Sequence, residues 1–159
     1  IVVSQYSIGL DGLAYYYESE DFLNNKISGK FKSHMNWPDA LSLPYCVSCD
    51  SNLLKTFSSF KAGITITATG FYAPQGRNLR LKSSIKDLHK KLEEFKFNDL
   101  RILNFEMESS AIYFLSKMLG HKSITICSVL SNRNIKTFKK EPKKIINKMI
   151  ESSLSIISK

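Results

Sequence analysis

The sequence lacks long apolar runs, repeats and low-complexity segments. A membrane-spanning helix needs roughly 20 consecutive apolar residues, and polar residues interrupt every apolar stretch here well before that length. The first residues, Ile1 to Ser4, have no Met and no basic region before the apolar ones, so they do not form a signal peptide. They have the composition of an inner sheet strand, and we expect the chain to begin inside a larger protein.

Cysteine is also scarce, with only Cys46, Cys49 and Cys127 in the chain. The C-x-x-C spacing of the first two suggests zinc binding or redox chemistry as one alternative. However, no second C-x-x-C and no pair of histidines completes a four-ligand zinc site, and no apolar helix follows as in a redox motif. An odd number of cysteines without a secretory signal favours reduced thiols. We therefore expect a cytoplasmic protein that binds no metal and no membrane.

Acidic residues are few, 14 against 23 Lys and Arg, which gives a formal net charge of +9. One alternative is a basic nucleic-acid-binding module in which Tyr15, Tyr16 and Tyr17 stack on bases. The lysines are dispersed, however, and their main cluster lies between Lys136 and Lys148 beside a helical pattern. The chain is also rich in Lys, Ile, Asn and Ser, as expected from an AT-rich genome. We expect no nucleic-acid partner and a buried sheet-edge position for the three tyrosines.

The 159 residues are enough for one domain with a hydrophobic core. Strands and helices alternate in the later half, which favours an α/β fold. The segment 24–43 contains Gly, Pro and polar residues and is predicted as a long loop. Periodicity and capping residues predict the other elements, namely strands over 2–8, 61–69, 100–104 and 123–130 and helices over 52–60, 85–95, 107–119 and 142–157.

A change from strand-like to helix-like periodicity occurs between Asn104 and Ala111. It places Glu106 and Glu108 at the start of a helix, where the helix dipole stabilises carboxylates. In open α/β sheets, ligands bind beyond the carboxyl ends of strands. Two carboxylates flanking Met107 can bind neighbouring sugar hydroxyls while the thioether covers the apolar face of the sugar. The alternative is an acidic helix N-terminus with a core Met.

Two other predicted strands also end in polar sequences, one in the segment from Phe71 to Arg77 and one at 131–133. The Gln75 amide offers a donor and an acceptor, which match the imide edge of a uracil ring. Arg77 can donate to the other carbonyl of the base, and Phe71 can pack against its ring. Taken singly, Gln and Arg in a loop are usually just solvated. If the three strands are neighbours, all three ends face one crevice.

These motifs together resemble the nucleoside phosphorylase superfamily, in its uridine phosphorylase branch. Their order and spacing match over the whole chain, and the segment from Val3 to Gly12 is similar to the family's strand and Leu-Asp-Gly turn. The resemblance implies a three-layer α/β/α fold with a mixed central sheet, of the phosphorylase/hydrolase type. Residues 1–159 would form a single partial domain, the C-terminal part of a subunit whose N-terminal part is missing.

The resemblance also implies a role for each residue. Gln75, Arg77 and Glu108 would be the catalytic residues, and the substrate-binding residues would be Phe71, Gln75, Arg77, Glu106, Met107, Glu108 and Arg133. Arg133 would act on the base side, and Asn132 stands where the purine-specific branch has an acidic Asp. This difference favours a pyrimidine. A purine nucleoside phosphorylase or a water-using nucleosidase of the same fold remains an alternative.

The implied reaction is phosphorolysis of uridine to uracil and ribose 1-phosphate, a step of nucleoside catabolism and pyrimidine salvage. The partners would be the nucleoside and inorganic phosphate as co-substrate, without a cofactor. Family members carry most of their phosphate site in the N-terminal half, so we expect this chain to be inactive alone. The full-length protein would be a homo-oligomer, either a dimer or a hexamer.

Overall fold

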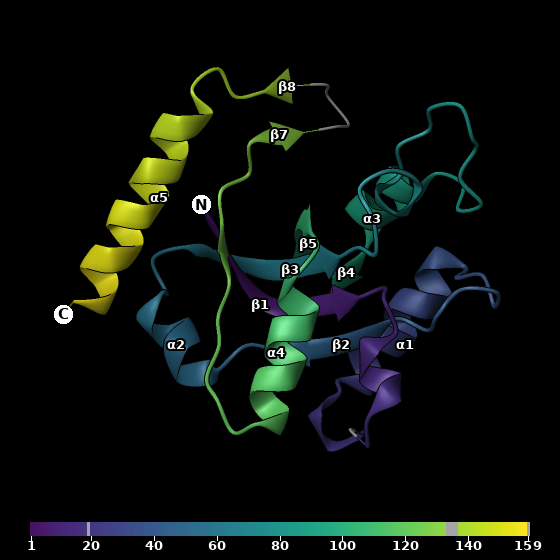
Figure 1. Ribbon diagram of the computed structural model, residues 1–159, viewed down its shortest axis with the longest axis horizontal. Coiled ribbons are helices and arrows are strands. Elements are labelled where there is room, and N and C mark those ends of the chain that lie inside the picture. The colour runs from purple at the N-terminus through teal and green to yellow at the C-terminus, as the bar shows by residue number, and fades with distance from the viewer. Residues whose placement is uncertain (19, 133–136, 159) are drawn as a thin grey trace.

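The protein is described here by a computed structural model that covers residues 1–18, 20–132 and 137–158. Within these ranges, six strands form one mixed sheet in the order β2-β1-β3-β5-β4, and β6 pairs with the beginning of β1 (Figure 1). Three strands are parallel to one another, namely β1 (Val2–Gly9), β3 (Lys61–Thr67) and β5 (Leu100–Glu106). The antiparallel strands are β2 (Tyr45–Ser48), β4 (Lys96–Phe97) and β6 (Ile126–Cys127).

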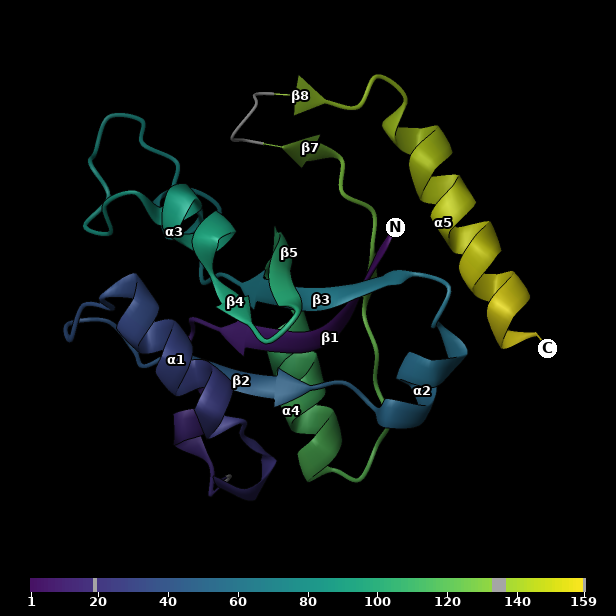
Figure 2. The ribbon, with the colours of Figure 1, turned by 180° about the vertical axis from the view of Figure 1, so that it is seen from behind.

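Helices cover both faces of this sheet. The helices are α1 (Asn25–Met35), α2 (Ser51–Thr56), α3 (Leu88–Glu94), α4 (Ser109–Met118) and α5 (Pro142–Ile157), with short 3-10 turns η1 (Leu13–Tyr16), η2 (Glu20–Phe22) and η3 (Ala73–Gln75). Figure 1 shows α4 in front of the sheet, and Figure 2, from behind, shows α1 in front of it. The predicted three-layer α/β/α class with a mixed sheet is confirmed.

Two hydrophobic clusters, one on each face, hold the layers together. On one side, Ile8 and the β-branched Ile64 and Ile66 of the inner strands pack with residues of α1 and α3. On the other side, Tyr45 of β2 packs with Phe114 of α4, and both side chains are fully buried. The α1-side face of the inner strands is thus apolar, whereas the opposite face carries the buried hydroxyls of Ser7, Thr65 and Thr67. A slip by one residue would exchange these two faces, so their difference fixes the register of the inner strands.

The predicted loop over 24–43 is wrong, because α1 occupies its first half. The Asn24 side chain caps this helix by accepting a hydrogen bond from the Ile27 backbone N–H. Ile27, Phe31 and Met35 follow at intervals of four and are fully buried. Gly29 misled the prediction, although a side chain at this position would meet no atom within 4 Å. The buried stripe outweighs the low helix propensity of glycine.

The predicted buried strand over 123–130 is largely wrong as well. The strand is confined to Ile126–Cys127, next to a backbone bond from the Ser4 N–H to Thr125 O at 3.0 Å, and the segment is half-buried. It continues to β7 (Ser131–Asn132), which forms a small separate hairpin with β8 (Thr137–Phe138). The apolar side chains of this segment predict a buried strand, but an irregular connection occupies most of it.

The C-terminal helix α5 confirms the predicted helix over 142–157, with Pro142 in its first turn. In both views it stands to one side of the sheet layers (Figures 1 and 2). None of its residues is buried, and Ile150, Leu154 and Ile157 on its apolar stripe are exposed. Among the residues described, no helix has the length and apolarity required to cross a bilayer.

The expected burial of the three tyrosines is wrong. They belong to η1 and the residue after it, and the side chain of Tyr16 is 84% exposed. A sheet edge would have covered them, but the turn at Gly12, with a φ of 72°, directs the chain away from the sheet. This turn and the basic beginning of α5 lie at different sides of the molecule (Figure 1). The aromatic and basic groups therefore do not form one surface.

Candidate active site

The parallel arrangement of β1, β3 and β5 places their carboxyl ends at one edge of the sheet. Backbone hydrogen bonds extend this alignment beyond the strands, from Leu10 N–H to Thr67 O at 3.0 Å and from Ala68 N–H to Glu106 O at 2.9 Å. The segment after β3 leads to the loop from Phe71 to Arg77, and the segment after β5 is Met107 and Glu108. Two of the three predicted polar strand ends are therefore direct neighbours.

The loop after β3 is a compact turn with Gln75 inside it. Its backbone closes by hydrogen bonds from the N–H groups of Gln75 and Arg77 to Tyr72 O, at 3.0 and 2.9 Å. The Gln75 side chain is only 4% exposed, whereas Phe71 and Tyr72 are largely exposed. The loop thus holds the amide rigidly and presents two aromatic rings to solvent.

The Arg77 side chain lies over Phe71, at the beginning of the same loop. Its guanidinium carbon lies 3.3 Å from the centre of the Phe71 ring, a close cation–π contact. Among the described residues, the Arg77 Nε–H is buried without a hydrogen-bond partner. A buried unpaired donor is costly, so this group is suited to donate to a bound acceptor. Arg77 and Phe71, predicted to act on one base, are therefore brought together.

His89, at the beginning of α3, is a residue that the sequence interpretation missed. Its ring lies beneath Gly76, where an added Cβ would approach the imidazole Nε2 to 2.7 Å. The ring also meets Phe105 of β5 edge-on, with centroids 6.0 Å apart. Its position within a predicted amphipathic helix gave no sign of this contact. His89 thus supports the loop between Gln75 and Arg77 from below.

At the end of β5, Glu106 is engaged by protein groups on both carboxylate oxygens. Its Oε1 accepts from the Thr67 hydroxyl at 2.5 Å, and its Oε2 accepts from the backbone N–H groups of Glu108 and Ser109 at 2.8 and 2.7 Å. These N–H groups begin α4 and have no partners within the helix, so Glu106 caps its positive end. The helix-capping alternative therefore describes Glu106 well.

Met107 and Glu108 differ from Glu106, because both side chains are exposed. Within the described part of the chain, the Glu108 carboxylate accepts a hydrogen bond at Oε2 from the neighbouring Met107 backbone N–H, at 3.1 Å. The alternative of a core position for Met107 is excluded by its exposure. An accessible carboxylate beside an accessible thioether is the arrangement expected for binding a sugar.

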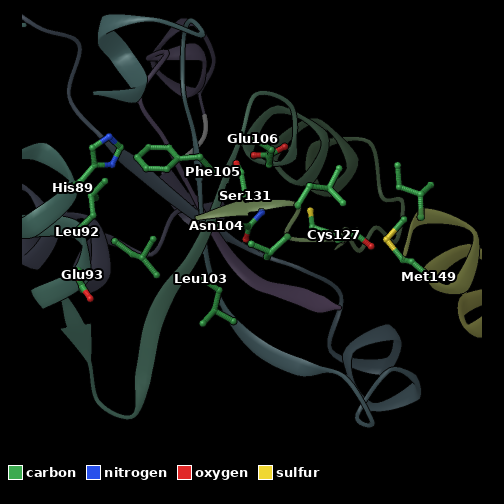
Figure 3. A pocket seen from close by; sticks show the side chains of 15 residues that line it. His89, Leu92, Glu93, Leu103, Asn104, Phe105, Glu106, Cys127, Ser131 and Met149 are labelled. Carbon is green, nitrogen blue, oxygen red and sulfur yellow. The ribbon is translucent and has the colours of Figure 1, made fainter. Parts of the chain in front are cut away.

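The third strand end is only partly described. Arg133 lies outside the described residues, so its predicted place in the site is untested. Ser131 lines a cavity of about 700 Å³ together with Asn104, Phe105 and Glu106 of β5 (Figure 3). On the opposite side this cavity is lined by Ile146 and Met149 of α5. It connects two of the strand ends, but its lining includes neither the loop residues nor Glu108.

The C-x-x-C pair lies in β2 and directly after it, with Cys46 opposite Ile8 of β1. Both Cys46 and Cys49 are buried free thiols. Burial raises the pKa of Cys46 far above its usual range and is the main cause that raises the pKa of Cys49 to about 11. Thiolates are the species that bind metals and attack disulfides, so both thiols are in their inert form at neutral pH. The described residues contain no group of three or more potential metal ligands.

The whole chain, residues 1–159, matches the family model of the Phosphorylase superfamily, and the protein belongs to this superfamily. The uridine phosphorylase of Thermococcus kodakarensis is 32% identical over 88 residues, 54% of this chain and 30% of that protein. A solved nucleoside phosphorylase of Trypanosoma brucei, described as showing uridine phosphorylase activity, is 24% identical with a TM-score of 0.85. That match covers 99% of this chain and 57% of the solved one. The predicted family is confirmed, and the chain spans less than two thirds of either relative.

Proposed function

We propose that the protein containing this chain catalyses the phosphorolysis of a pyrimidine nucleoside, converting uridine and phosphate to uracil and ribose 1-phosphate. The observation that carries the proposal is the backbone bond from Ala68 to Glu106, which aligns the beginnings of the two site segments. One segment carries an amide and a guanidinium, and the other carries an exposed carboxylate. These groups match the two halves of a pyrimidine nucleoside, a polar ring and a diol.

The loop from Phe71 to Arg77 would bind the base. Gln75 would pair with an imide edge, and the unpaired Nε–H of Arg77 would donate to a carbonyl of the ring. Negative charge develops on the base as its bond to the sugar breaks, and fixed donors stabilise this charge better than mobile water does. The burial of Gln75 supports such a fixed position.

The segment after β5 would bind the sugar. Glu108 would accept hydrogen bonds from the 2′- and 3′-hydroxyls, and Met107 would cover the apolar face of the ribose. This contribution is one of orientation, because it holds C1′ in line for attack. Phosphate oxygen would form a bond to C1′ as the bond from C1′ to the base nitrogen breaks, and the electron pair of that bond would leave with the base. Arg133 would act on the base side.

This chain would supply the base and ribose sites but not the phosphate site. The aligned part of the solved relative is 57% of that chain, so much of a relative's sequence has no counterpart here. We therefore expect the isolated chain to be inactive in phosphorolysis. For the complete protein we propose a cytoplasmic homo-oligomer, a dimer or a hexamer, that acts in nucleoside catabolism and pyrimidine salvage.

The test uses the complete natural polypeptide and measures uracil release from uridine with and without phosphate. Glu108→Gln should lower kcat/KM by about a hundredfold, because the sugar loses its charged acceptor. Glu151→Gln is the matched control, an exposed carboxylate on α5 that should have no effect. Full activity in the Glu108 variant would refute the sugar assignment, and release independent of phosphate would indicate a nucleosidase instead.

The nucleic-acid alternative predicts the opposite pattern. Replacing the exposed lysines Lys139, Lys140, Lys143 and Lys144 by Gln should leave uridine turnover unchanged under our proposal. Under the alternative, these changes would weaken binding to nucleic acid and flatten its salt dependence. Tight, sequence-selective binding by the unmodified protein would overturn the enzymatic proposal.

A further inference from the structure

We propose that Thr67 and Glu106 are positioning residues that fix the sugar-binding carboxylate of Glu108, and that Glu106 does not itself bind the sugar. The inference deepens the proposed function and depends on it for the role of Glu108. It assigns a function to Thr67, a fully buried residue of β3. It also assigns different roles to Glu106 and Glu108, two chemically identical residues with only Met107 between them.

The first argument is that Glu106 already has protein partners on both oxygens. It accepts one hydroxyl and two backbone N–H groups at 2.5 to 2.8 Å, and its side chain is half-buried. Hydrogen bonds from N–H groups to a carboxylate are about twice as strong as neutral ones. Binding a sugar hydroxyl would require Glu106 to give up such a bond and uncap α4. Glu108 would lose only the bond from Met107 N–H.

The second argument comes from the proton of the Thr67 hydroxyl. A hydroxyl has one proton, and Thr67 donates it to Glu106. The contact at 2.9 Å between Ser7 Oγ and Thr67 Oγ1 then has Ser7 as its donor, and it is much shorter than the 3.5 Å contact from Ser7 Oγ to the Thr65 carbonyl. Thr67 Oγ1 also accepts from the Ser110 backbone N–H at 2.9 Å. The Thr67 hydroxyl therefore donates one hydrogen bond and accepts two. Ser7 of β1 donates to Thr67 of β3, and Thr67 donates to Glu106 of β5.

These bonds connect the sheet directly to the backbone of the sugar-binding residue. Thr67 holds Glu106, and Glu106 holds the N–H of Glu108, whose side chain has no capping role in α4. The Glu108 backbone is therefore fixed at one point while its carboxylate stays exposed. Hydrogen bonds of this kind to the backbone keep a binding side chain such as Glu108 within the narrow range of positions in which it can bind its ligand.

The chain offers a matched control two residues earlier on the same strand. Thr65 is as buried as Thr67, is hydrogen-bonded to the Ser4 hydroxyl, and donates to Asn104 Oδ1 at 2.8 Å. It contacts no residue that we place in the sugar site. Thr65→Val and Thr67→Val remove the same atom from two equally buried positions, and Thr67 is the one that is bonded to Glu106 and to the Ser110 N–H. Glu106→Gln then tests the bond to Glu106 separately from the bond to Ser110.

The experiment measures the affinities of uracil and uridine for the complete natural polypeptide by calorimetry. The ratio Kd(uracil)/Kd(uridine) reports what the sugar contributes. We expect Thr67→Val and Glu106→Gln to lower this ratio by about tenfold with uracil affinity retained. Thr67→Ser, which keeps the hydroxyl, should restore the ratio. Thr65→Val should leave it unchanged.

Two outcomes would overturn the inference. In one, the ratio is unchanged in both Thr67→Val and Glu106→Gln. In the other, Thr65→Val lowers the ratio as much as Thr67→Val does, which would indicate a general loss of packing. If Thr67→Val does not fold, Glu106→Gln and Thr67→Ser still decide between these outcomes. Failure of the unmodified protein to bind either ligand would instead refute the proposed function.

Discussion

The α4 side of the sheet and the α5 region differ sharply in how their helices are held. Helix α4 buries Tyr113 and Phe114 against β1 and β2, and its N-terminus is capped by Glu106. Helix α5 has the longer amphipathic pattern but buries no residue. Amphipathic periodicity therefore predicts a helix, whereas its place in the molecule depends on the surface that faces it. The best-supported parts of the candidate site belong to the first of these regions.

The largest expected effect separates the two regions by stability. Phe114→Ala should lower the free energy of unfolding by about 3–5 kcal/mol, because it leaves a cavity in a fully packed core. Leu154→Ala on α5 should change it by less than about 0.5 kcal/mol, since that side chain is exposed. Urea denaturation followed by circular dichroism measures both. Equal losses would show that α5 is packed in solution.

Tyr113 offers a way to sharpen the comparison, because it connects α4 with β1 and with the segment before β6. Its hydroxyl donates to Ser4 O at 2.7 Å and accepts from the Thr125 backbone N–H at 2.8 Å. Tyr113→Phe should cost about 1–3 kcal/mol and accelerate hydrogen exchange of the Thr125 amide. Tyr45→Phe, which removes a hydroxyl bonded to Ser110, is the control. Unchanged protection of Thr125 in Tyr113→Phe would contradict the connection.

On the opposite side of the sheet, where α3 packs, Gly76 should be more sensitive than its small size suggests. Its φ of +71° is unfavourable for other residues, and an added Cβ would collide with the His89 ring. Gly76→Ala should cost about 1–2 kcal/mol and weaken uracil binding. Gly29→Ala in α1 is the control and should stabilise the protein by about 0.5–1 kcal/mol. Adding His89→Ala to Gly76→Ala should relieve the collision but leave the backbone strain.

The smallest expected effect is an alkaline loss of stability on the α4 side, where Cys49 belongs to the cluster around Phe114. Folding raises the pKa of Cys49 from 9.0 to about 11, mainly through burial, so the folded state keeps a proton that the unfolded state releases. Stability should therefore fall as the pH rises from about 9 to about 11. Cys49→Ala should reduce this slope, which thermal denaturation at several pH values would measure. An unchanged slope would show that other groups cause it.

Sequence alone predicted the inner strands, α4 and the pairing of polar segments at their ends, because β-branched alternation and capping are local signals. It did not predict α1, because Gly29 has a low helix propensity. The capping residue Asn24 and the four-residue spacing of Ile27, Phe31 and Met35 are local signals that favour this helix. It could not predict the support of Gly76 by His89 or of Glu106 by Thr67. Those contacts join residues that only the folded sheet and loop bring together.

The over-long strand prediction at 123–130 failed for a different reason. Apolar residues indicate burial of some kind, but pairing needs a neighbour with free backbone groups, and within the described residues Val2, Val3 and Ser4 at the beginning of β1 provide them. The exposed tyrosines have a similar explanation, because hydrophobic side chains do not by themselves determine which surface covers them. Local sequence signals thus predicted the type of each element and its polar residues better than they predicted which segments pack against each other.

Under the proposed function, the stacking of Arg77 on Phe71 means that the free protein fills part of the proposed base site with its own side chain. A planar cation occupies one face of the ring on which a planar base would pack, so an incoming base competes with an internal ligand. The measured affinity then reports the difference between two stacked states and underestimates the intrinsic attraction of the ring for the base. A neutral replacement at position 77 would remove this competitor together with a donor, and the two losses would act in opposite directions.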